Sequence, residues 1–174
     1  MRRIRIVVAY DGTNYCGWQI QPNGITIEEI LNRQISKLTG EDIRIIGASR
    51  TDSGVHALGN VAVFDTESRI PGDRFAYALN QKMPEDIVIV RSDEVQIDWH
   101  PRYQNEISKT YEYHIYNAKV RNPLKNRYST FVSFDLDVEK MRQGAKYILG
   151  EHDFASFCNV RTNAKDTVRT VHEI

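Results

Sequence analysis

Apolar runs divide the first half of the chain into short extended segments. Residues 3–10 hold the continuous apolar core Ile6-Val7-Val8-Ala9, which predicts a strand buried on both faces. Further apolar runs predict strands at residues 43–48, 60–64 and 87–90.

Two helices are expected between these strands. In residues 26–38, Thr26 and Glu29 form a capping box, and apolar side chains follow at helical spacing. Residues 71–83 begin with Pro71 and carry a second apolar face. The resulting order, β-α-β-β-α-β, is that of a split βαβ, or ferredoxin-like, unit with helices on one face of an antiparallel sheet.

The second half of the chain predicts a similar but unfinished plan. Residues 108–116 alternate in polarity and predict a long strand, residues 138–149 predict a helix, and residues 168–174 predict the start of another strand. We therefore expect an α+β protein with two domains. The N-terminal split-βαβ domain would span residues 1–105, and an incomplete C-terminal domain would span residues 106–174.

Composition and charge narrow the functional classes. The 174 residues carry 23 Lys+Arg and 23 Asp+Glu, and this balance argues against a polycation that coats nucleic acid, although a local basic groove stays possible. Cys16 and Cys158 lie outside any C-x-x-C pattern, so neither a zinc site nor a disulfide is predicted. We find no signal peptide and no membrane-spanning stretch in the sequence, and we expect a cytoplasmic location.

The segment from Gly47 to Ala57 contains the most informative chemistry. It places Arg50 two residues before Asp52, after a predicted strand and at the start of a glycine-containing loop. On an extended segment both side chains would point to the same side, and the guanidinium would keep the carboxylate ionised and oriented. Such a carboxylate can be a nucleophile at a sugar anomeric carbon, or simply half of a structural ion pair, which is the commoner role.

Aromatic and basic residues add candidates for RNA binding. Tyr111, on the predicted long strand, can stack on a base, move a proton or pack in a core. The loop that contains Trp18 and Gln19 suits unstacked RNA bases, with a packed turn as the alternative. Several basic residues after the midpoint can contact phosphate or be ordinary solvated charges: Arg121, Lys125, Arg127, Arg161, Lys165 and Arg169.

Four segments together resemble the tRNA pseudouridine synthases of the TruA type. They are residues 10–19, 49–57, 109–113 and 150–157, which contain Tyr-Asp-Gly-Thr with Gly-Trp-Gln, Ser-Arg-Thr-Asp-Ser-Gly-Val-His-Ala, Lys-Thr-Tyr-Glu-Tyr, and Gly-Glu-His-Asp-Phe with a later Phe. They occur in family order along nearly the whole chain, and the second is long and very specific. The resemblance implies two ferredoxin-like halves that form a mixed, largely antiparallel sheet, with helices on one face and an RNA cleft on the other.

The resemblance also implies a reaction and roles for residues. The family isomerises uridine to pseudouridine at positions 38 to 40 of the tRNA anticodon stem-loop, as a homodimer, with no cofactor and no metal. By resemblance Asp52 is the catalytic carboxylate, Arg50 its ion-pair partner and base-flipping aid, and Tyr111 the residue that stacks on the target base. The expected RNA-binding residues are Thr51, Ser53, His56, Trp18, Gln19, Lys109 and Arg161.

The chain departs from the family in its length, and two other functional classes fit parts of its sequence. Family members continue with a strand and a helix beyond the point that Ile174 represents, so we expect a shortened member. The shorter length makes a non-catalytic RNA-binding module on the same scaffold the alternative. A glycosidase or nucleosidase would need a second acid near Asp52, and none stands out in the sequence. Attack at C1′, addition to C6 and elimination at C2′ all stay open.

Overall fold

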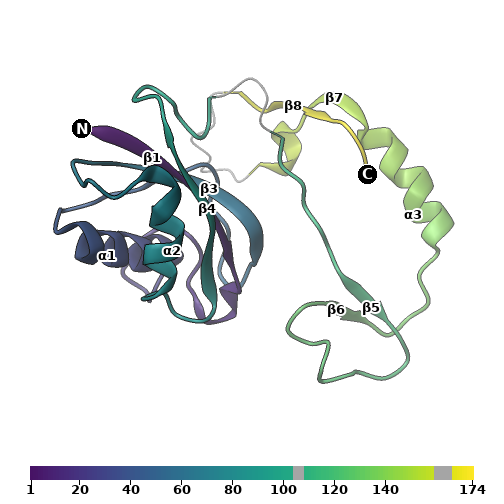
Figure 1. Cartoon of the computed structure of the whole chain (residues 1–174). Helices are drawn as coiled ribbons and strands as arrows, with labels where there is room; N and C mark the ends of the chain where they lie inside the picture. The colour runs from purple at the N-terminus through teal and green to yellow at the C-terminus, as the bar shows by residue number, and fades with distance from the viewer. Residues whose placement is uncertain (104–107, 159–165) are drawn as a thin grey trace. The chain divides into compact units, whose positions relative to one another are not determined.

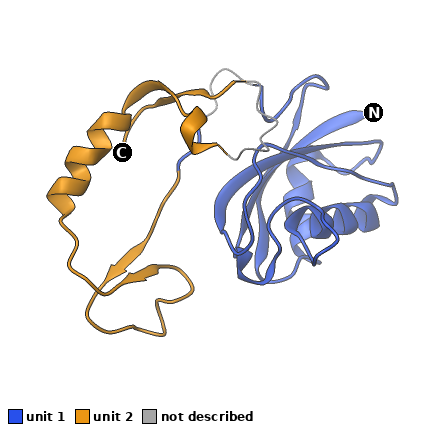
Figure 2. Ribbon diagram, turned by 180° about the vertical axis from the view of Figure 1, so that it is seen from behind, with its two compact units in different colours: residues 1–110 blue, residues 111–174 orange. Residues whose placement is uncertain are grey.

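A computed structural model describes residues 1–103, 108–158 and 166–174, which form two compact units, Met1–Thr110 and Tyr111–Ile174 (Figure 2). The first unit follows the predicted order of strands and helices. Its elements are β1 (Arg2–Tyr10), α1 (Ile27–Thr39), β2 (Ile46–Gly47), β3 (Ala57–Thr66), α2 (Phe75–Asn80) and β4 (Ile87–Val95), with short 3-10 turns η1 (Gly12–Asn14) and η2 (Gly72–Arg74).

The four strands of the first unit form one sheet in the order β2-β3-β1-β4. β1 pairs antiparallel with both β3 and β4, and β2 pairs antiparallel with β3. Both helices lie on one side of this sheet (Figure 1). Burial alternates along β1, where Ile4, Ile6 and Val8 are fully buried while their neighbours are partly exposed. The expectation that this strand is buried on both faces is therefore wrong.

Helix α1 closes the core as its sequence predicts. The Thr26 side chain accepts a hydrogen bond from the Glu29 amide at 3.3 Å, and Gly40 ends the helix in the left-handed conformation. The apolar stripe Ile27, Leu31 and Ile35 is fully buried against the sheet. Transfer of such side chains from water stabilises the unit by about 1.5–3 kcal/mol each.

Side-chain hydrogen bonds explain why two predicted elements are shorter. The amides of Ile43 and Ile45 donate to Ser36 and Asn32 of α1, both at 2.9 Å, so the residues before Ile46 are fastened to the helix and make no strand ladder. The helix predicted at residues 71–83 is reduced to η2 and the short α2.

The end of α2 has its own anchor. The Asn80 side chain donates to the Ile89 carbonyl at 2.9 Å and accepts from the Ile89 amide at 2.8 Å. This two-way contact binds the last residue of the helix to β4, so the chain turns towards that strand where the sequence pattern predicted further helix.

The second unit has a different character. Its elements are β5 (Ile115–Asn117), β6 (Thr130–Val132), α3 (Val138–Ala145), η3 (Lys146–Ile148), β7 (Gly150–Asp153), η4 (Ala155–Phe157) and β8 (Val168–Val171). β5 and β6 form a parallel pair, and β7 and β8 an antiparallel pair. None of the described residues of this unit is buried, whereas the first unit contains a large apolar cluster.

The long strand predicted at residues 108–116 is wrong. Strand β5 begins at Ile115, and the alternating side chains before it are exposed, with Tyr111 at 73% and Tyr113 at 86%. A strand with one buried face is held in register by that face, and this segment has none. No bounds were predicted for strands β6 and β7, because each is short and lacks a distinctive apolar pattern.

Packing of α2 on the sheet gives a direct stability test. The Phe75 ring is fully buried and meets the Phe64 ring edge to face, with centroids 5.3 Å apart. We expect Phe75→Ala to lower the free energy of unfolding by about 3–5 kcal/mol in urea denaturation. Tyr77→Ala on the exposed side of the same helix serves as the control and should cost less than about 0.5 kcal/mol. Equal losses for the two variants would contradict this packing.

Candidate active site

The loop between β2 and β3 presents Asp52 at the surface. The side chains of Arg50 and Asp52 are both exposed, and the Val55 amide donates to the Asp52 carbonyl at 3.1 Å, which closes a tight turn. A carboxylate on such a turn is accessible to a large substrate. An exposed carboxylate holds one position only if other segments of the chain fix the backbone of its loop.

Thr51 supplies the first part of that fixation. Its carbonyl accepts from the Trp18 amide at 3.0 Å, and its hydroxyl lies 2.9 Å from the Tyr10 hydroxyl. The residue between Arg50 and Asp52 is thus held by both its backbone and its side chain. The two exposed side chains on either side of it share one anchored point.

Tyr15 fixes the other end of the turn. Its carbonyl accepts from the Ser53 hydroxyl and from the Gly54 amide, each at 3.2 Å. The Tyr15 ring is buried, and its hydroxyl donates to the Asp86 carboxylate at 2.5 Å. Burial, followed by the hydrogen bond and the charge of Asp86, raises the pKa of the Tyr15 phenol well above its usual value.

A close backbone approach seals the contact between the two segments. A Cβ atom on Gly12 would lie 2.1 Å from the Val55 carbonyl oxygen, so no other residue fits at this position. The Gly12 amide also lies 3.2 Å from His56 Nδ1, and that nitrogen is 3.0 Å from an Asp11 carboxylate oxygen. His56 therefore fastens the end of the loop to the turn that follows β1.

Trp18 is a packing residue in this structure. Its side chain is 2% exposed, its ring lies against Gly47, and its centroid is 6.0 Å from that of Tyr10. The ring has no free face for a base, so the packing alternative agrees with the structure and the expectation of RNA contact by this ring does not. Gln19, the next residue, is exposed.

The ion pair expected between Arg50 and Asp52 is not formed here. In the part of the chain that the structure describes, no hydrogen bond or ion pair joins these two side chains. Strand β2 ends at Gly47, so the rule that places residues i and i+2 on one side of a strand no longer applies to them. Exposed ion pairs are worth at most about 1 kcal/mol, which is too little to impose the contact.

The remaining candidate residues lie apart from this loop in the sequence. Lys109 is exposed near the end of the first unit, and Tyr111 is the first residue of the second unit, outside any strand. Arg161 and Lys165 lie outside the described residues. The structure thus brings Thr51, Ser53 and His56 into one hydrogen-bonded loop around Asp52.

The sequence reasoning missed Asn60 as a supporting residue. Asn60 is 8% exposed, and its amide donates to the Ser49 carbonyl at 3.0 Å and to the Tyr10 hydroxyl at 3.4 Å. A polar residue at the head of an apolar strand was the signal that could have revealed it, because buried amides are retained where they are hydrogen-bonded.

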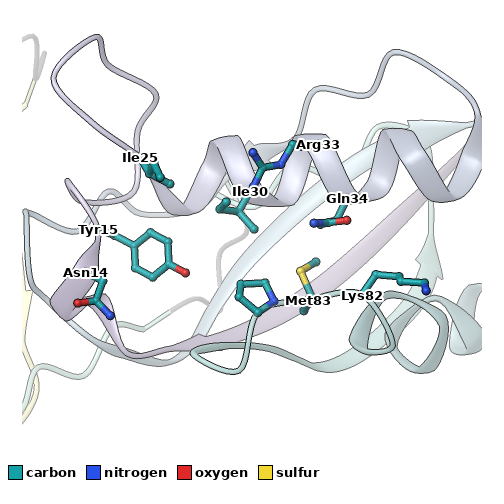
Figure 3. A pocket seen from close by; sticks show the side chains of 9 residues that line it. Asn14, Tyr15, Ile25, Ile30, Arg33, Gln34, Lys82 and Met83 are labelled. Carbon is teal, nitrogen blue, oxygen red and sulfur yellow. The ribbon is translucent and has the colours of Figure 1, made fainter.

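A hollow lies on the helical side of the same unit (Figure 3). It has a volume of about 380 Å³, and the Tyr15 ring and the side chain of Met83 line it together with Ile30 and Arg33 of α1. Asp52 is not among its lining residues. Tyr15 therefore faces the hollow with its ring and the Asp52 loop with its carbonyl.

Neither a metal-binding cluster nor a membrane-spanning helix is present in the described part of the chain. Within residues 1–103, 108–158 and 166–174, no group of three or more His, Cys, Asp or Glu side chains is arranged to hold a metal ion. None of the helices in those same ranges combines the length and the apolar character needed to cross a bilayer.

The matching family model and three similar relatives all point to the same family. A family model described as tRNA pseudouridine synthase matches residues 6–104 and 145–174. The tRNA pseudouridine synthase A of Acetivibrio thermocellus is 49% identical over 174 residues, which is 100% of this chain and 71% of that protein. A Thermoanaerobacter protein of the same name is 45% identical, and tRNA pseudouridine synthase A 2 of Clostridium perfringens is 48% identical, with the same coverage of both chains. The chain is thus shorter than these relatives, as expected.

The role of Asn60 can be tested by exchange. We expect Asn60→Ala to leave the Ser49 carbonyl without this donor and to lower the free energy of unfolding by about 1–3 kcal/mol. Amide exchange at Trp18, which donates to Thr51, should become faster. Gln19→Ala, which changes the exposed residue next to Trp18, is the control and should leave the exchange of the Trp18 amide unchanged. Unchanged protection of the Trp18 amide in Asn60→Ala would refute the anchoring role.

The raised pKa of Tyr15 predicts a pH dependence of stability. The unfolded chain loses this phenolic proton first as pH rises, so the stabilisation is present below the ordinary value of 10.0 and is lost above it. We expect Tyr15→Phe to flatten the fall in unfolding free energy from about pH 10 upward, measured by urea denaturation. Some slope should remain, because burial also raises the pKa of Tyr10. Identical slopes for both proteins would contradict the assignment.

Proposed function

Because the chain belongs to the tRNA pseudouridine synthase family, we propose that it isomerises uridine to pseudouridine at positions 38 to 40 of the tRNA anticodon stem-loop. It is an isomerase, and its substrate class is uridine in tRNA. The observation that carries the finer proposal is the position of Asp52. Its carboxylate is exposed on a loop whose backbone is fixed at Thr51 and Gly54.

The reaction requires a carboxylate that is both accessible and fixed. The N1–C1′ bond of the uridine breaks, the uracil turns, and C5 bonds to C1′; the C5 proton leaves and N1 takes up a proton, so the product is an isomer of the substrate. Asp52 attacks C1′, adds to C6 or promotes elimination at C2′, and all three routes place its carboxylate beside the extruded nucleoside. The anchors at Thr51 and Ser53 support any of them, because they hold the carboxylate without using its oxygens.

Arg50 and Tyr111 would serve the extruded base. Flipping a nucleotide costs a few kcal/mol of stacking and pairing, which the enzyme must offset. The exposed guanidinium of Arg50, one residue from Thr51, is suited to fill the space that the base leaves and to pair with Asp52 when RNA is bound. The exposed ring of Tyr111 is available to stack on the base.

The remaining RNA contacts are proposed for residues near the loop and for two basic residues elsewhere in the chain. Ser53, His56 and Gln19 border Asp52 or its anchors, and Lys109 would meet a phosphate, as would Arg161. Trp18 acts here by packing beneath the loop. Neither metal nor cofactor takes part in the proposed reaction.

The same proposal assigns the two units to the two halves of the pseudouridine synthase fold. The four-stranded unit is one split-βαβ half of a pseudouridine synthase fold, and residues 106–174 belong to the other half. The sheet order β2-β3-β1-β4 with both helices on one side supports this assignment. We propose that the protein works in the cytoplasm as a homodimer.

A non-catalytic RNA-binding module is the second candidate. The observation that favours it concerns the second unit, where no described residue is buried and Tyr111 is 73% exposed. A stacking residue without packed support is held less firmly than catalysis requires. Binding without turnover would then be the whole function of the chain.

The catalytic assignment is tested by replacing the carboxylate. We expect Asp52→Asn to reduce tritium release from C5-labelled tRNA on the order of a thousandfold or more, while tRNA affinity changes little. Asp42→Asn, which alters another exposed aspartate of the same unit, is the matched control and should retain full activity.

Two results would count against the proposal. Undiminished tritium release by Asp52→Asn would remove this residue from the chemistry. Tight tRNA binding by the unaltered chain with no tritium release at all would favour the RNA-binding module.

A further inference from the structure

One segment of the second unit is basic although the whole chain is neutral. Residues 113–134 contain four Lys or Arg and no Asp or Glu, in a protein whose net charge is zero. The same segment holds five Phe or Tyr rings. It also lies outside residues 6–104 and 145–174, to which the family model aligns. The function already proposed does not account for this concentration of cations and rings.

The segment is folded into a hydrogen-bonded loop. Strands β5 and β6 pair at its base, where the Thr130 amide donates to the His114 carbonyl at 2.8 Å. Within the loop the Lys125 carbonyl accepts from the Tyr128 amide at 3.2 Å and from the Ser129 hydroxyl at 2.8 Å. These hydrogen bonds fix the backbone positions of Lys125 and Tyr128.

The loop surrounds a hollow of about 290 Å³. Its lining includes Tyr116, Leu124, Lys125 and Tyr128. This volume is at the small end of the range for ligand sites, which suits a single base better than a larger molecule. Tyr128 lines the hollow and is 55% exposed, so part of its side-chain surface is accessible from solvent.

Cations stand over aromatic rings in this segment, and of the two cations Lys125 lines the hollow. The Lys125 ammonium is 5.2 Å from the centre of the Tyr116 ring, and the Arg121 guanidinium is 4.8 Å from that of Phe131. Across the described residues, neither cation forms a salt bridge with a carboxylate, whereas Lys119 lies 2.8 Å from Asp135. Lys125 and Arg121 can therefore take an external anion without first breaking an ion pair.

We propose that this hollow binds one unpaired nucleotide of the tRNA substrate, with the base against the Tyr128 ring and the phosphate at the Lys125 ammonium. Flat rings beside unneutralised cations are what single-stranded RNA requires, because its bases expose their faces and its backbone carries one charge per residue. Paired bases do not offer those faces. The site rests on the proposed function, and it would increase affinity for tRNA without taking part in bond breaking.

A pair of lysines from the same loop gives a charge-matched test. We expect Lys125→Ala to weaken tRNA binding roughly tenfold and to reduce the slope of log affinity against log salt by about one. Lys119→Ala removes the same charge from the ion pair with Asp135 and should change affinity less than about twofold. Filter binding of labelled tRNA across a salt series measures both quantities.

The ring is tested separately. Tyr128→Phe keeps the stacking face and should retain affinity, while Tyr128→Leu should weaken binding several-fold at every salt concentration. In the unaltered protein, tRNA that carries 4-thiouridine should crosslink to the peptide that contains Tyr128. This readout does not depend on any variant folding correctly.

Each alternative outcome is distinguishable. Equal affinities and salt slopes for Lys125→Ala and Lys119→Ala, with crosslinks elsewhere, would overturn the site. Displacement of tRNA from the loop by polyglutamate as readily as by single-stranded RNA of equal charge would overturn it in favour of an acidic peptide. Loop crosslinks to RNA without any tritium release would support the site while the proposed isomerisation fails.

Discussion

The hydrogen bonds that Thr51 makes to the segment after β1 are the constraint on which the candidate site depends. Its carbonyl and hydroxyl are both taken, by the Trp18 amide and the Tyr10 hydroxyl, so the residue beside Asp52 has little freedom. Tyr15 holds the far side of the same turn through Ser53. The Asp52 carboxylate is therefore positioned by backbone anchors that do not use its own oxygens, which is the arrangement that the proposed nucleophile or base needs.

These anchors also explain why the first unit is built as it is. The segment that is hydrogen-bonded to the Asp52 loop connects β1 to α1. The buried Trp18 ring of this segment packs against Gly47 at the end of β2. The loop is thus tied to a sheet and a helix at once. Among its described residues the second unit has exposed rings and cations and no buried side chain, which is the composition that the proposed RNA contacts require.

Local patterns predicted most of the first unit and, in the second, helix α3 and strand β8. The Thr26 cap, the stripe on α1 and the strand runs follow from the sequence, because burial and capping are local properties. The identity of the candidate site came from one specific motif around Asp52. The supports from Asn60 and Tyr15 could not be predicted, since they join residues that are distant in the sequence. The strand expected before Ile115 failed because alternation without burial does not hold a ladder.

The most direct test of the account is whether the 174-residue chain converts uridine in an isolated anticodon stem-loop. Mass analysis after chemical labelling of pseudouridine would locate any product within the loop. We expect the modification at a uridine among positions 38 to 40, formed with no added metal or cofactor. Stem-loop binding at saturation with every uridine unchanged would contradict the claim that the anchored Asp52 loop is a working active site.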